Sequence, residues 1–407
     1  MAEIEVPPYF LCPITLQTMK DPVTIATGIT YDRESIEKWM FVKKNNTCPV
    51  TKQILLDTET TPNITLRRVI QSWCTLHASD EIQRLPTPKA PVTKTELVKL
   101  LNDAKSPQTQ IQSLRKLKSV ASLNQTNQRC LESVGAPEFL ASLIVTKTIE
   151  SRCAEVSEHL SELNKACDEA LSLLYTLQLS EAGLKSIAKE ELIESLTTVM
   201  QSGSYESRVY AIMLLKSIVE VADPNQLTNL KPEFFIELTQ ILNDQITNKA
   251  SKAAFKVLIS VLPWGRNRVK AGEAGLVNVL IDLLLDSCSD KRANEMMLIV
   301  LDFICQCAEG RSELLKHGAG LAIVSKKILR ISKIASERAV RILHSVCKFS
   351  GTPAVLQEML QIGVVAKLCL VVQVDCGLKT KERAKEMLKL NAKAWRNSPC
   401  VPNNLFS

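Results

Sequence analysis

The longest hydrophobic pattern in this chain of 407 residues is helical and repeats between residues 96 and 397. An alanine is followed four residues later by an apolar residue and usually seven residues later by another, which places them on one helix face. Successive alanines are 41, 43, 39, 46 and 45 residues apart. The copies are Ala170-Leu174-Leu177, Ala211-Leu215-Ile218, Ala254-Leu258-Val261, Ala293-Met297-Val300, Ala339-Leu343-Val346 and the shorter Ala384-Leu388.

A second unit, a turn followed by another apolar helix, recurs between these helices. Its copies begin at Gly135, Lys189, Lys231, Gly275, Gly320 and Gly363, and a weaker first copy of the alanine pattern is Gln110-Leu114-Leu117. A helical period of about 40–47 residues is typical of armadillo or HEAT repeats, because one repeat cannot bury its apolar face alone. The glycine-bearing turns and the short preceding helices favour armadillo. We therefore predict an all-α armadillo-repeat solenoid over residues 96–397, followed by a tail at 398–407.

The spacing is irregular at the start of this region. The first two copies are 60 residues apart, which predicts an insertion near residues 146–165, as either a longer helix or a loop.

Armadillo proteins that hold extended peptides carry an asparagine six residues after the repeating alanine. None of the six equivalent residues here is asparagine: they are Thr176, Ser217, Ser260, Ile299, Ser345 and Leu390. We expect the short hydroxyl side chains to serve helix packing, and the groove to bind a folded partner or a helix.

Prolines 86, 88 and 91 disfavour both helix and strand, which predicts an extended linker over residues 81–95. The linker separates the solenoid from a small α+β domain at residues 1–80. In that domain the pattern predicts strands at 23–26 and 30–31 around Gly28, and a helix that Asp32 caps from Arg33. A second helix, capped by Asn63, extends through Leu76. Its predicted core stripe is Leu66, Val69, Ile70 and Trp73.

Charge and composition reduce the number of possible partners and cellular locations. The net charge of +7 is modest and no dense basic run with interleaved aromatic residues occurs, so we expect no nucleic-acid partner. No apolar run reaches the ~18 residues that span a membrane, and the first residues are acidic, without a signal sequence. Thirteen scattered cysteines are typical of reduced, buried side chains. We expect a cytoplasmic protein, with the nucleus as an alternative location.

The small domain holds too few metal ligands for a two-zinc RING domain, which needs eight. Residues 1–80 contain only Cys12, Cys48, Cys74 and His77, and neither Cys12 nor Cys48 has a second ligand nearby. We therefore expect no metal and no cofactor. Hydrogen bonds, ion pairs and packing must hold the loops instead, and the candidates are Asp21, Asp32, Arg33, Glu37 and Lys52.

The ordered motifs of residues 1–80 resemble the U-box, the zinc-free relative of the RING domain. They are Cys12-Pro13-Ile14, Met19-Lys20-Asp21-Pro22-Val23, Gly28-Ile29-Thr30-Tyr31-Asp32-Arg33, Ile36-Glu37-Lys38-Trp39, Cys48-Pro49-Val50-Thr51, Pro62-Asn63, Leu66-Arg67 and Ile70-Gln71-Ser72-Trp73. The resemblance implies a domain that recruits a ubiquitin-conjugating enzyme (E2) on an apolar surface.

By the same resemblance, Ile14 and Leu16 lie on the first loop of that surface, Trp39 on the helix and Pro49 on the second loop. Exposed apolar side chains grouped in this way act as interface anchors. Lys52 is implied to contact ubiquitin and to hold its thioester in a reactive geometry. The alternative for these apolar residues is a place in the core, and for Lys52 an ordinary solvated surface position.

The sequence offers no activated nucleophile, since Cys12 and Cys48 lie next to proline without a neighbouring histidine. The whole chain resembles the plant U-box armadillo-repeat E3 ubiquitin ligases, in a stress- and immunity-linked subgroup that lacks an N-terminal helical domain. This implies non-covalent transfer of ubiquitin from E2 to a lysine of a substrate on the solenoid. The alternatives are an adaptor whose U-box binds E2 without activating it, an armadillo transport receptor and a thiol-dependent ligase. Self-association is left open.

Overall fold

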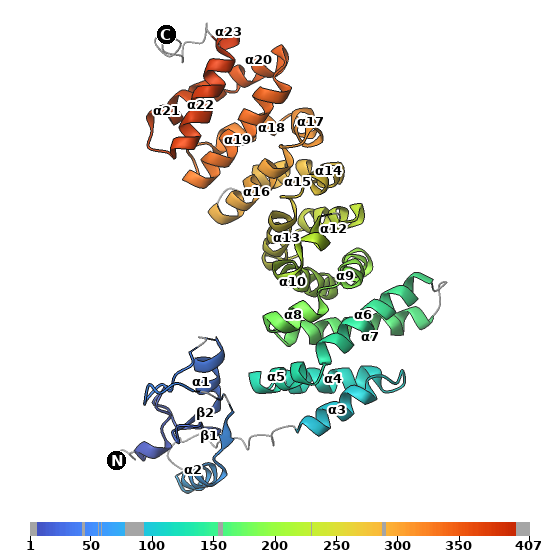
Figure 1. Ribbon diagram of the computed structural model, residues 1–407, viewed down its shortest axis with the longest axis vertical. Helices are drawn as coiled ribbons and strands as arrows, with labels where there is room; N and C mark the ends of the chain where they lie inside the picture. The colour runs from blue at the N-terminus through green and yellow to red at the C-terminus, as the bar shows by residue number, and fades with distance from the viewer. Residues whose placement is uncertain are drawn as a thin grey trace. The chain divides into compact units, whose positions relative to one another are not determined.

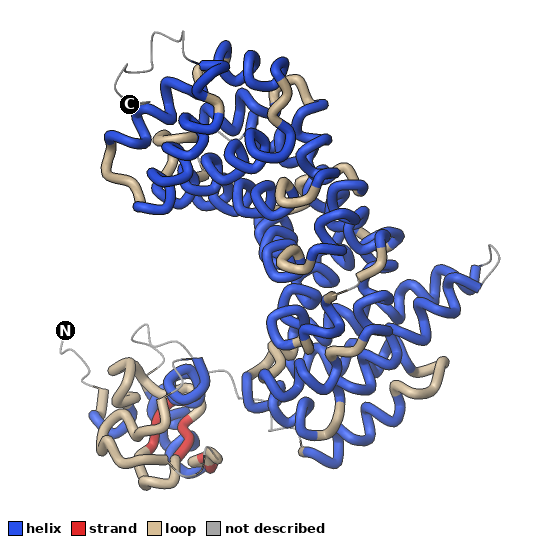
Figure 2. Tube along the Cα trace, turned by 45° about the horizontal axis from the view of Figure 1, so that its top comes forward, coloured by secondary structure: helices blue, strands red, loops and turns tan. Residues whose placement is uncertain are grey.

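The computed structural model describes residues 6–42, 45–55, 57, 59–77, 93–153, 158–228, 230–286 and 290–395. The chain forms two compact units, Met1–Val134 and Gly135–Ser407. Figures 1 and 2 show helices through both units, and among the described residues strands occur only in the N-terminal domain. Most of the predicted linker lies outside the described residues.

The N-terminal domain has a small antiparallel sheet in the order β2-β1-β3. Val23 in β1 pairs with Tyr31 in β2 and with Pro62 in β3, a strand that we did not predict. The elements are a 3-10 turn at Pro8–Phe10, β1 (Pro22–Thr24), β2 (Thr30–Asp32), α1 (Arg33–Glu37), a π-helical turn at Lys38–Val42, β3 (Thr61–Pro62) and α2 (Ile64–Leu76).

Local capping signals set the two helices of this domain, but one cap differs from the prediction. Asn63 caps α2, accepting a hydrogen bond from the backbone N–H of Leu66 at 3.0 Å, as predicted. Asp32 precedes α1 without a side-chain cap, because its carboxylate accepts bonds from the first loop instead. In α2 Ile70 is buried and Leu66 and Trp73 pack against the core, whereas Val69 is exposed, so its predicted core position was wrong.

Three helices complete the first unit: α3 (Lys94–Asp103), α4 (Gln110–Ala121) and α5 (Gln125–Ser133). A capping box starts α3: Thr93 accepts from the N–H of Glu96, and Glu96 accepts from the N–H of Thr93.

All regular secondary structure among the described residues of the second unit is helical. Its helices are α6 (Ala136–Cys153), α7 (Glu158–Thr176), α8 (Glu181–Ile187), α9 (Glu190–Ser202), α10 (Tyr205–Val221), α11 (Pro224–Leu227), α12 (Pro232–Asn243), α13 (Asn248–Val261), α14 (Gly265–Glu273), α15 (Leu276–Asp286), α16 (Lys291–Ile304), α17 (Ala308–Lys316), α18 (Gly320–Lys327), α19 (Lys333–Ser350), α20 (Pro353–Gln361), α21 (Val364–Gln373), α22 (Leu378–Leu390) and α23 (Ala392–Trp395). The described residues of the predicted insertion, 146–153 and 158–165, belong to the two long helices α6 and α7.

These helices stack in two rows, which confirms the predicted solenoid. One row holds the alanine-bearing helices, α7, α10, α13, α16, α19 and α22, each packed on the next. The other row holds α6, α9, α12, α15 and α18, again each packed on the next. The repeating alanines are fully buried at 170, 211, 254, 339 and 384, and Ala293 is half-buried.

The turn glycines and the hydroxyl side chains have local structural roles. Gly275 and Gly363 adopt φ values of +76° and +77° before α15 and α21, a conformation that favours glycine. The hydroxyls of Thr176, Ser217 and Ser260 donate to the carbonyl four residues earlier in their own helices. Ser345 on α19 instead donates to Cys305 O, at the end of α16, at 2.8 Å.

A buried carboxylate ties two of the last repeats together. Asp302 on α16 is 2% exposed and lies 3.0 Å from Arg338 Nη1 and 3.2 Å from Arg341 Nε, both on α19. Removing one member of such a buried set costs about 3–5 kcal/mol of stability, because the others are left as unpaired charges.

In the part of the chain that the structure describes, no single helix is long and apolar enough to span a membrane. The pair α20 and α21 meets the length and composition criteria only together, across a 69° bend.

Candidate functional site

Two loops of the N-terminal domain share one hydrogen-bonding pattern. In the first, the N–H of Cys12 donates to Gln17 O and the N–H of Leu16 donates to Cys12 O, both at 2.8 Å. In the second, Cys48 and Gln53 form the matching bond at 2.8 Å, and Lys52 donates to Cys48 O at 3.0 Å. Each loop is closed by an isolated antiparallel bridge, Leu11–Thr18 or Thr47–Ile54.

The fifth residue of each loop has a left-handed backbone. Leu16 has φ of 57° and Lys52 has φ of 59°. This conformation costs a non-glycine residue roughly 1–2 kcal/mol, and it persists where the surrounding bonds fix it. Leu16 and Lys52 are both exposed, so the strained positions present one apolar and one cationic side chain to solvent.

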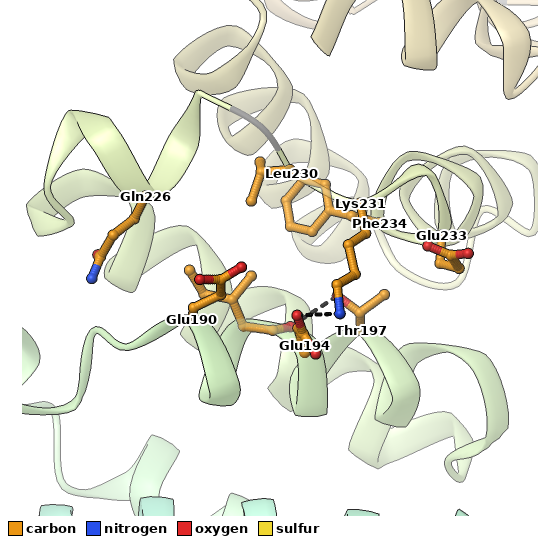
Figure 3. Close-up of a pocket in the computed structure, with 9 residues that line it drawn as sticks. Glu190, Glu194, Thr197, Gln226, Leu230, Lys231, Glu233 and Phe234 are labelled. Carbon is orange, nitrogen blue, oxygen red and sulfur yellow. Dashed lines mark hydrogen bonds and ion pairs between the residues drawn. The ribbon is translucent and has the colours of Figure 1, made fainter. Parts of the chain in front are cut away.

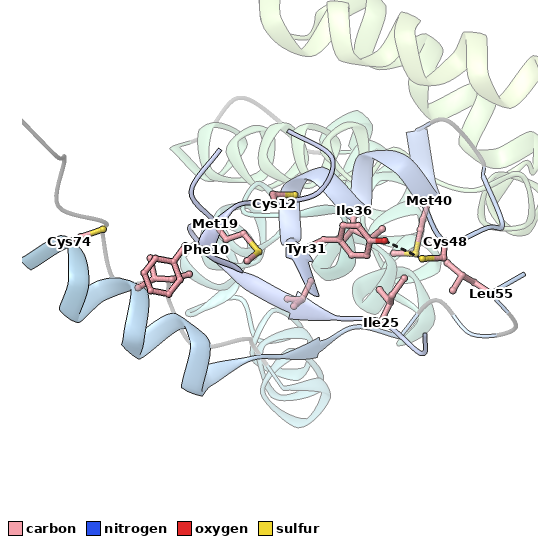
Figure 4. Packing of buried hydrophobic residues seen from close by; sticks show 12 residues of the cluster. Phe10, Cys12, Met19, Ile25, Tyr31, Ile36, Met40, Cys48, Leu55 and Cys74 are labelled. Atoms are coloured by element: carbon pink, nitrogen blue, oxygen red, sulfur yellow. Dashed lines mark hydrogen bonds between the residues drawn. The ribbon is translucent and has the colours of Figure 1, made fainter. Parts of the chain in front are cut away.

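Tyr31 in β2 holds the second loop from inside the domain. Its ring is fully buried, and its hydroxyl lies 3.1 Å from Cys48 Sγ (Figure 4). The same hydroxyl accepts a bond from the N–H of Val50 at 3.3 Å. The sulfur of Cys48 also accepts from Thr27 Oγ1 and from the N–H of Thr51, both at 3.4 Å.

Asp32, the next residue, holds the first loop. Its Oδ1 accepts bonds from the N–H groups of Lys20 and Asp21 at 2.8 and 2.9 Å. Its own N–H donates to Cys12 Sγ at 3.3 Å.

Arg33 adds an ion pair between the first loop and the helix. Its Nε is 2.6 Å from Asp21 Oδ2, and its Nη1 donates to Thr60 Oγ1 at 3.2 Å and lies 3.7 Å from Glu37. Arg67 on α2 also lies 3.6 Å from Asp21. Three consecutive residues, 31 to 33, therefore tie both loops to the sheet and to α1.

Cys48 departs from the expectation that nothing lowers its thiol pKa. Burial raises the pKa, but hydrogen bonds from Thr27, Thr51 and Tyr31 outweigh burial and lower it from 9.0 to about 6. The side chain is nevertheless 0% exposed, so no substrate reaches the sulfur. For Tyr31, burial and the bond to Cys48 raise the pKa of the phenol.

Ile14 and Trp39 line one hollow of about 320 Å³ between the first loop and α1. Both are half-buried and pack against the core with part of their surface. Trp39 also reaches the second loop, because its Nε1 donates to Thr47 O at 2.7 Å. Lys52 Nζ lies 5.8 Å from the centre of the Trp39 ring, within the range of a cation–π contact.

Comparison with known proteins assigns this architecture to a family. The family model described as "U-box domain" matches residues 6–79, and that of the "Plant U-box protein ARM repeat region" matches residues 96–407. The chain belongs to the plant U-box armadillo-repeat E3 ubiquitin-protein ligases.

Similar proteins cover almost all of the chain. It is 56% identical to E3 ubiquitin-protein ligase PUB23 of Arabidopsis thaliana, over 99% of this chain and 97% of the relative. It is 54% identical to E3 ubiquitin-protein ligase PUB22 of the same plant, over 99% and 98%. Among solved structures, an engineered protein aligns with a TM-score of 0.45 and 17% identity, over 77% of this chain and 86% of its own. The chain is thus an E3 ubiquitin ligase with a U-box and armadillo repeats.

Sequence reasoning missed two exposed apolar residues of the U-box loops. Leu16, which we predicted, is 74% exposed, but Val50 and Ile54 are also exposed, at 51% and 73%. The sequence does contain a signal for these positions, because the two loops have matching hexapeptides. Residues 12–17 are Cys-Pro-Ile-Thr-Leu-Gln, and residues 48–53 are Cys-Pro-Val-Thr-Lys-Gln. This match makes Val50 the counterpart of Ile14, and Lys52 the counterpart of Leu16. Pro49 is half-buried on the second loop.

Among the described residues, no group of three or more His, Cys, Asp or Glu side chains is arranged to hold a metal ion. In the U-box the hydrogen bonds of Cys12 and Cys48 link the loops to β2.

We predict that Cys48 titrates near pH 6 in the folded chain. A thiol pKa lowered from 9.0 to about 6 adds stability that is fully present above pH 9 and is lost as the pH falls through 6. The ultraviolet absorbance of the thiolate measures this directly, as the difference between the wild type and Cys48→Ser across the pH range. Cys74→Ser is the control, because burial raises the pKa of Cys74. A Cys48 step at or above pH 9 would contradict the prediction.

Proposed function

We propose that the two loops and Trp39 recruit a ubiquitin-conjugating enzyme loaded with ubiquitin. The single observation that carries the proposal is a group of apolar side chains on and beside the two loops, each of which is closed by its own backbone hydrogen bonds. Leu16 and Ile54 are about three-quarters exposed, and Ile14 and Trp39 line one hollow. Exposed apolar groups on rigid loops are typical of protein interfaces. Pro49 and Val50 extend the surface on the second loop.

The proposed mechanism is non-covalent. Cys48 has a lowered pKa, yet its sulfur is fully buried and engaged in hydrogen bonds, so we assign it a structural role. Cys12 is buried as well and accepts a bond from the N–H of Asp32. The thioester then stays on the conjugating enzyme, and the U-box accelerates transfer by restricting that thioester to attack-ready conformations.

We further propose that Lys52 orients the loaded ubiquitin. Its ammonium group is exposed beside the Trp39 ring, at the edge of the proposed surface. A cation at this position can donate to a carbonyl of ubiquitin while the conjugating enzyme occupies the apolar part of the surface.

The armadillo solenoid is proposed to hold the protein that receives ubiquitin, in defence or abiotic-stress signalling in the cytoplasm. The support is the family assignment together with a helical array that offers a long surface.

We expect Ile14→Ala and Trp39→Ala to abolish self-ubiquitination with activating enzyme, ATP and a panel of conjugating enzymes. Truncating a central interface anchor costs about 2 kcal/mol or more, which is about 30-fold in affinity. Val69→Ala is the matched control, since Val69 is 48% exposed on α2 of the same domain. Circular dichroism establishes that the variants fold. Full activity of both folded variants would contradict the proposed surface, and an inactive wild type would favour an adaptor.

Lys52→Gln is expected to slow ubiquitin discharge while leaving affinity for the conjugating enzyme within about twofold. Losing one charge-assisted hydrogen bond of about 1.5–3 kcal/mol corresponds to a tenfold or larger loss of discharge rate. Single-turnover discharge of the loaded enzyme to free lysine measures it, with Arg68→Gln as a charge-matched exposed control on α2. A discharge rate equal to that of the wild type would assign Lys52 to the ordinary solvated surface.

A further inference from the structure

One repeat of the solenoid has an unusually short first helix. Helix α11 spans only the four residues Pro224–Leu227, whereas α8 has seven residues and α14, α17 and α20 have nine each. The sequence explains the difference: Pro224 starts α11 after its cap Asp223, and Pro232 starts α12. The residue before a proline is disfavoured in the helical conformation, and Lys231 is extended, so α11 cannot continue into α12.

A pocket of about 290 Å³ lies where this repeat is shortened, between α9, α11 and α12 (Figure 3). This volume is at the lower end of small-ligand sites, so it suits one long side chain and not a drug-sized molecule. Its apolar walls are the buried residues Ile193, Leu230 and Phe234.

The wall of the pocket is fixed from the next repeat. Buried Asn267 on α14 donates to Leu227 O at 2.7 Å, and Lys270 Nζ donates to Leu230 O at 2.6 Å. These two bonds hold the end of α11 and Leu230, the residue directly before Lys231, against the next repeat.

The charges that line the pocket are unbalanced. The lining residues include three glutamates, Glu190, Glu194 and Glu233, and one cation, Lys231, which is ion-paired with Glu194. Figure 3 shows Lys231, the residue before α12, reaching toward Glu194 on α9, with Glu190 on the same helix as Glu194. Among the lining side chains, Glu190 and Glu233 thus have no ion-pair partner and lie beside apolar walls, a combination that suits an aliphatic stem with a cationic head.

One residue that lines the pocket also carries a buried hydrogen-bond acceptor. Gln226 Oε1 is buried and has no hydrogen-bond partner in the described part of the chain. An unpaired buried acceptor is unfavourable, so a hydrogen-bond donor supplied by a bound side chain would stabilise it.

We propose that this pocket takes a lysine or arginine side chain from the protein that the ligase modifies. The inference rests on the proposed function, in which the solenoid holds the substrate, and it names the chemistry of one contact. The lysine held here is a docking residue, separate from the one that accepts ubiquitin.

Glu190 and Glu233 also lie in the first turns of α9 and α12, where a helix favours negative charge in any case. Two other glutamates serve as controls that distinguish a role in the pocket from stabilisation of a helix N-terminus. Glu191 and Glu206 occupy the first turns of α9 and α10, are exposed, and do not line the pocket. Replacing either pair with glutamine removes the same charge and the same favourable helix contacts.

The test is binding of a fluorescein-labelled hexalysine peptide to the full chain, followed by fluorescence polarisation at physiological salt. The wild type and Glu191→Gln/Glu206→Gln are expected to bind with affinities within about twofold, and Glu190→Gln/Glu233→Gln at least about tenfold more weakly. The same peptide with acetylated lysines, which keep the stem and lose the charge, is expected not to bind. Equal weakening by both double variants, equal binding of the acetylated peptide, or no binding by the wild type would each overturn the proposal.

The assay needs neither conjugating enzyme nor ATP, so its result is separate from that of the ligase proposal. Self-ubiquitination by Glu190→Gln/Glu233→Gln is expected to equal that of the wild type. If self-ubiquitination is intact and hexalysine binding is insensitive to Glu190 and Glu233, the pocket proposal fails alone.

Discussion

The U-box depends on side-chain cross-links between its two loops and its sheet. A domain of this size buries too little surface to hold long loops by packing alone. Three consecutive residues supply the links: Tyr31 bonds the second loop, Asp32 bonds the first, and Arg33 pairs with Asp21. Because these residues lie at the junction of β2 and α1, one short segment positions both loops and Trp39 at once.

The same arrangement explains why the apolar surface is rigid enough to be an interface. Each loop closes on itself with two backbone hydrogen bonds and holds its fifth residue in a left-handed conformation. The backbone of such loops loses little further freedom on binding, which favours affinity. The solenoid is stabilised differently, because each of its helices stacks on neighbouring helices. A shortened helix in one repeat then leaves a pocket without disturbing the others, as at α11.

Local signals predicted much of the structure. The repeating alanines mark the helices of one solenoid row, and Asn63 caps α2. The missed features depend on contacts between distant residues. Asp32 has the sequence of a helix cap, but its carboxylate finds N–H donors eleven and twelve residues away. The pKa of Cys48 depends on donors from Thr27 and Tyr31, which no spacing rule brings together. The only sequence signal for the exposure of Val50 is the match between the hexapeptides 12–17 and 48–53.

The most direct test of the central claim is whether the affinity for a conjugating enzyme depends on metal ions. The full chain is dialysed against a chelator and titrated calorimetrically with a purified conjugating enzyme, and the titration is repeated with added zinc. If residues 31–33 hold the loops, the two affinities are equal, and Arg33→Ala weakens binding in both conditions. Binding that disappears with the chelator and returns with zinc would contradict the account.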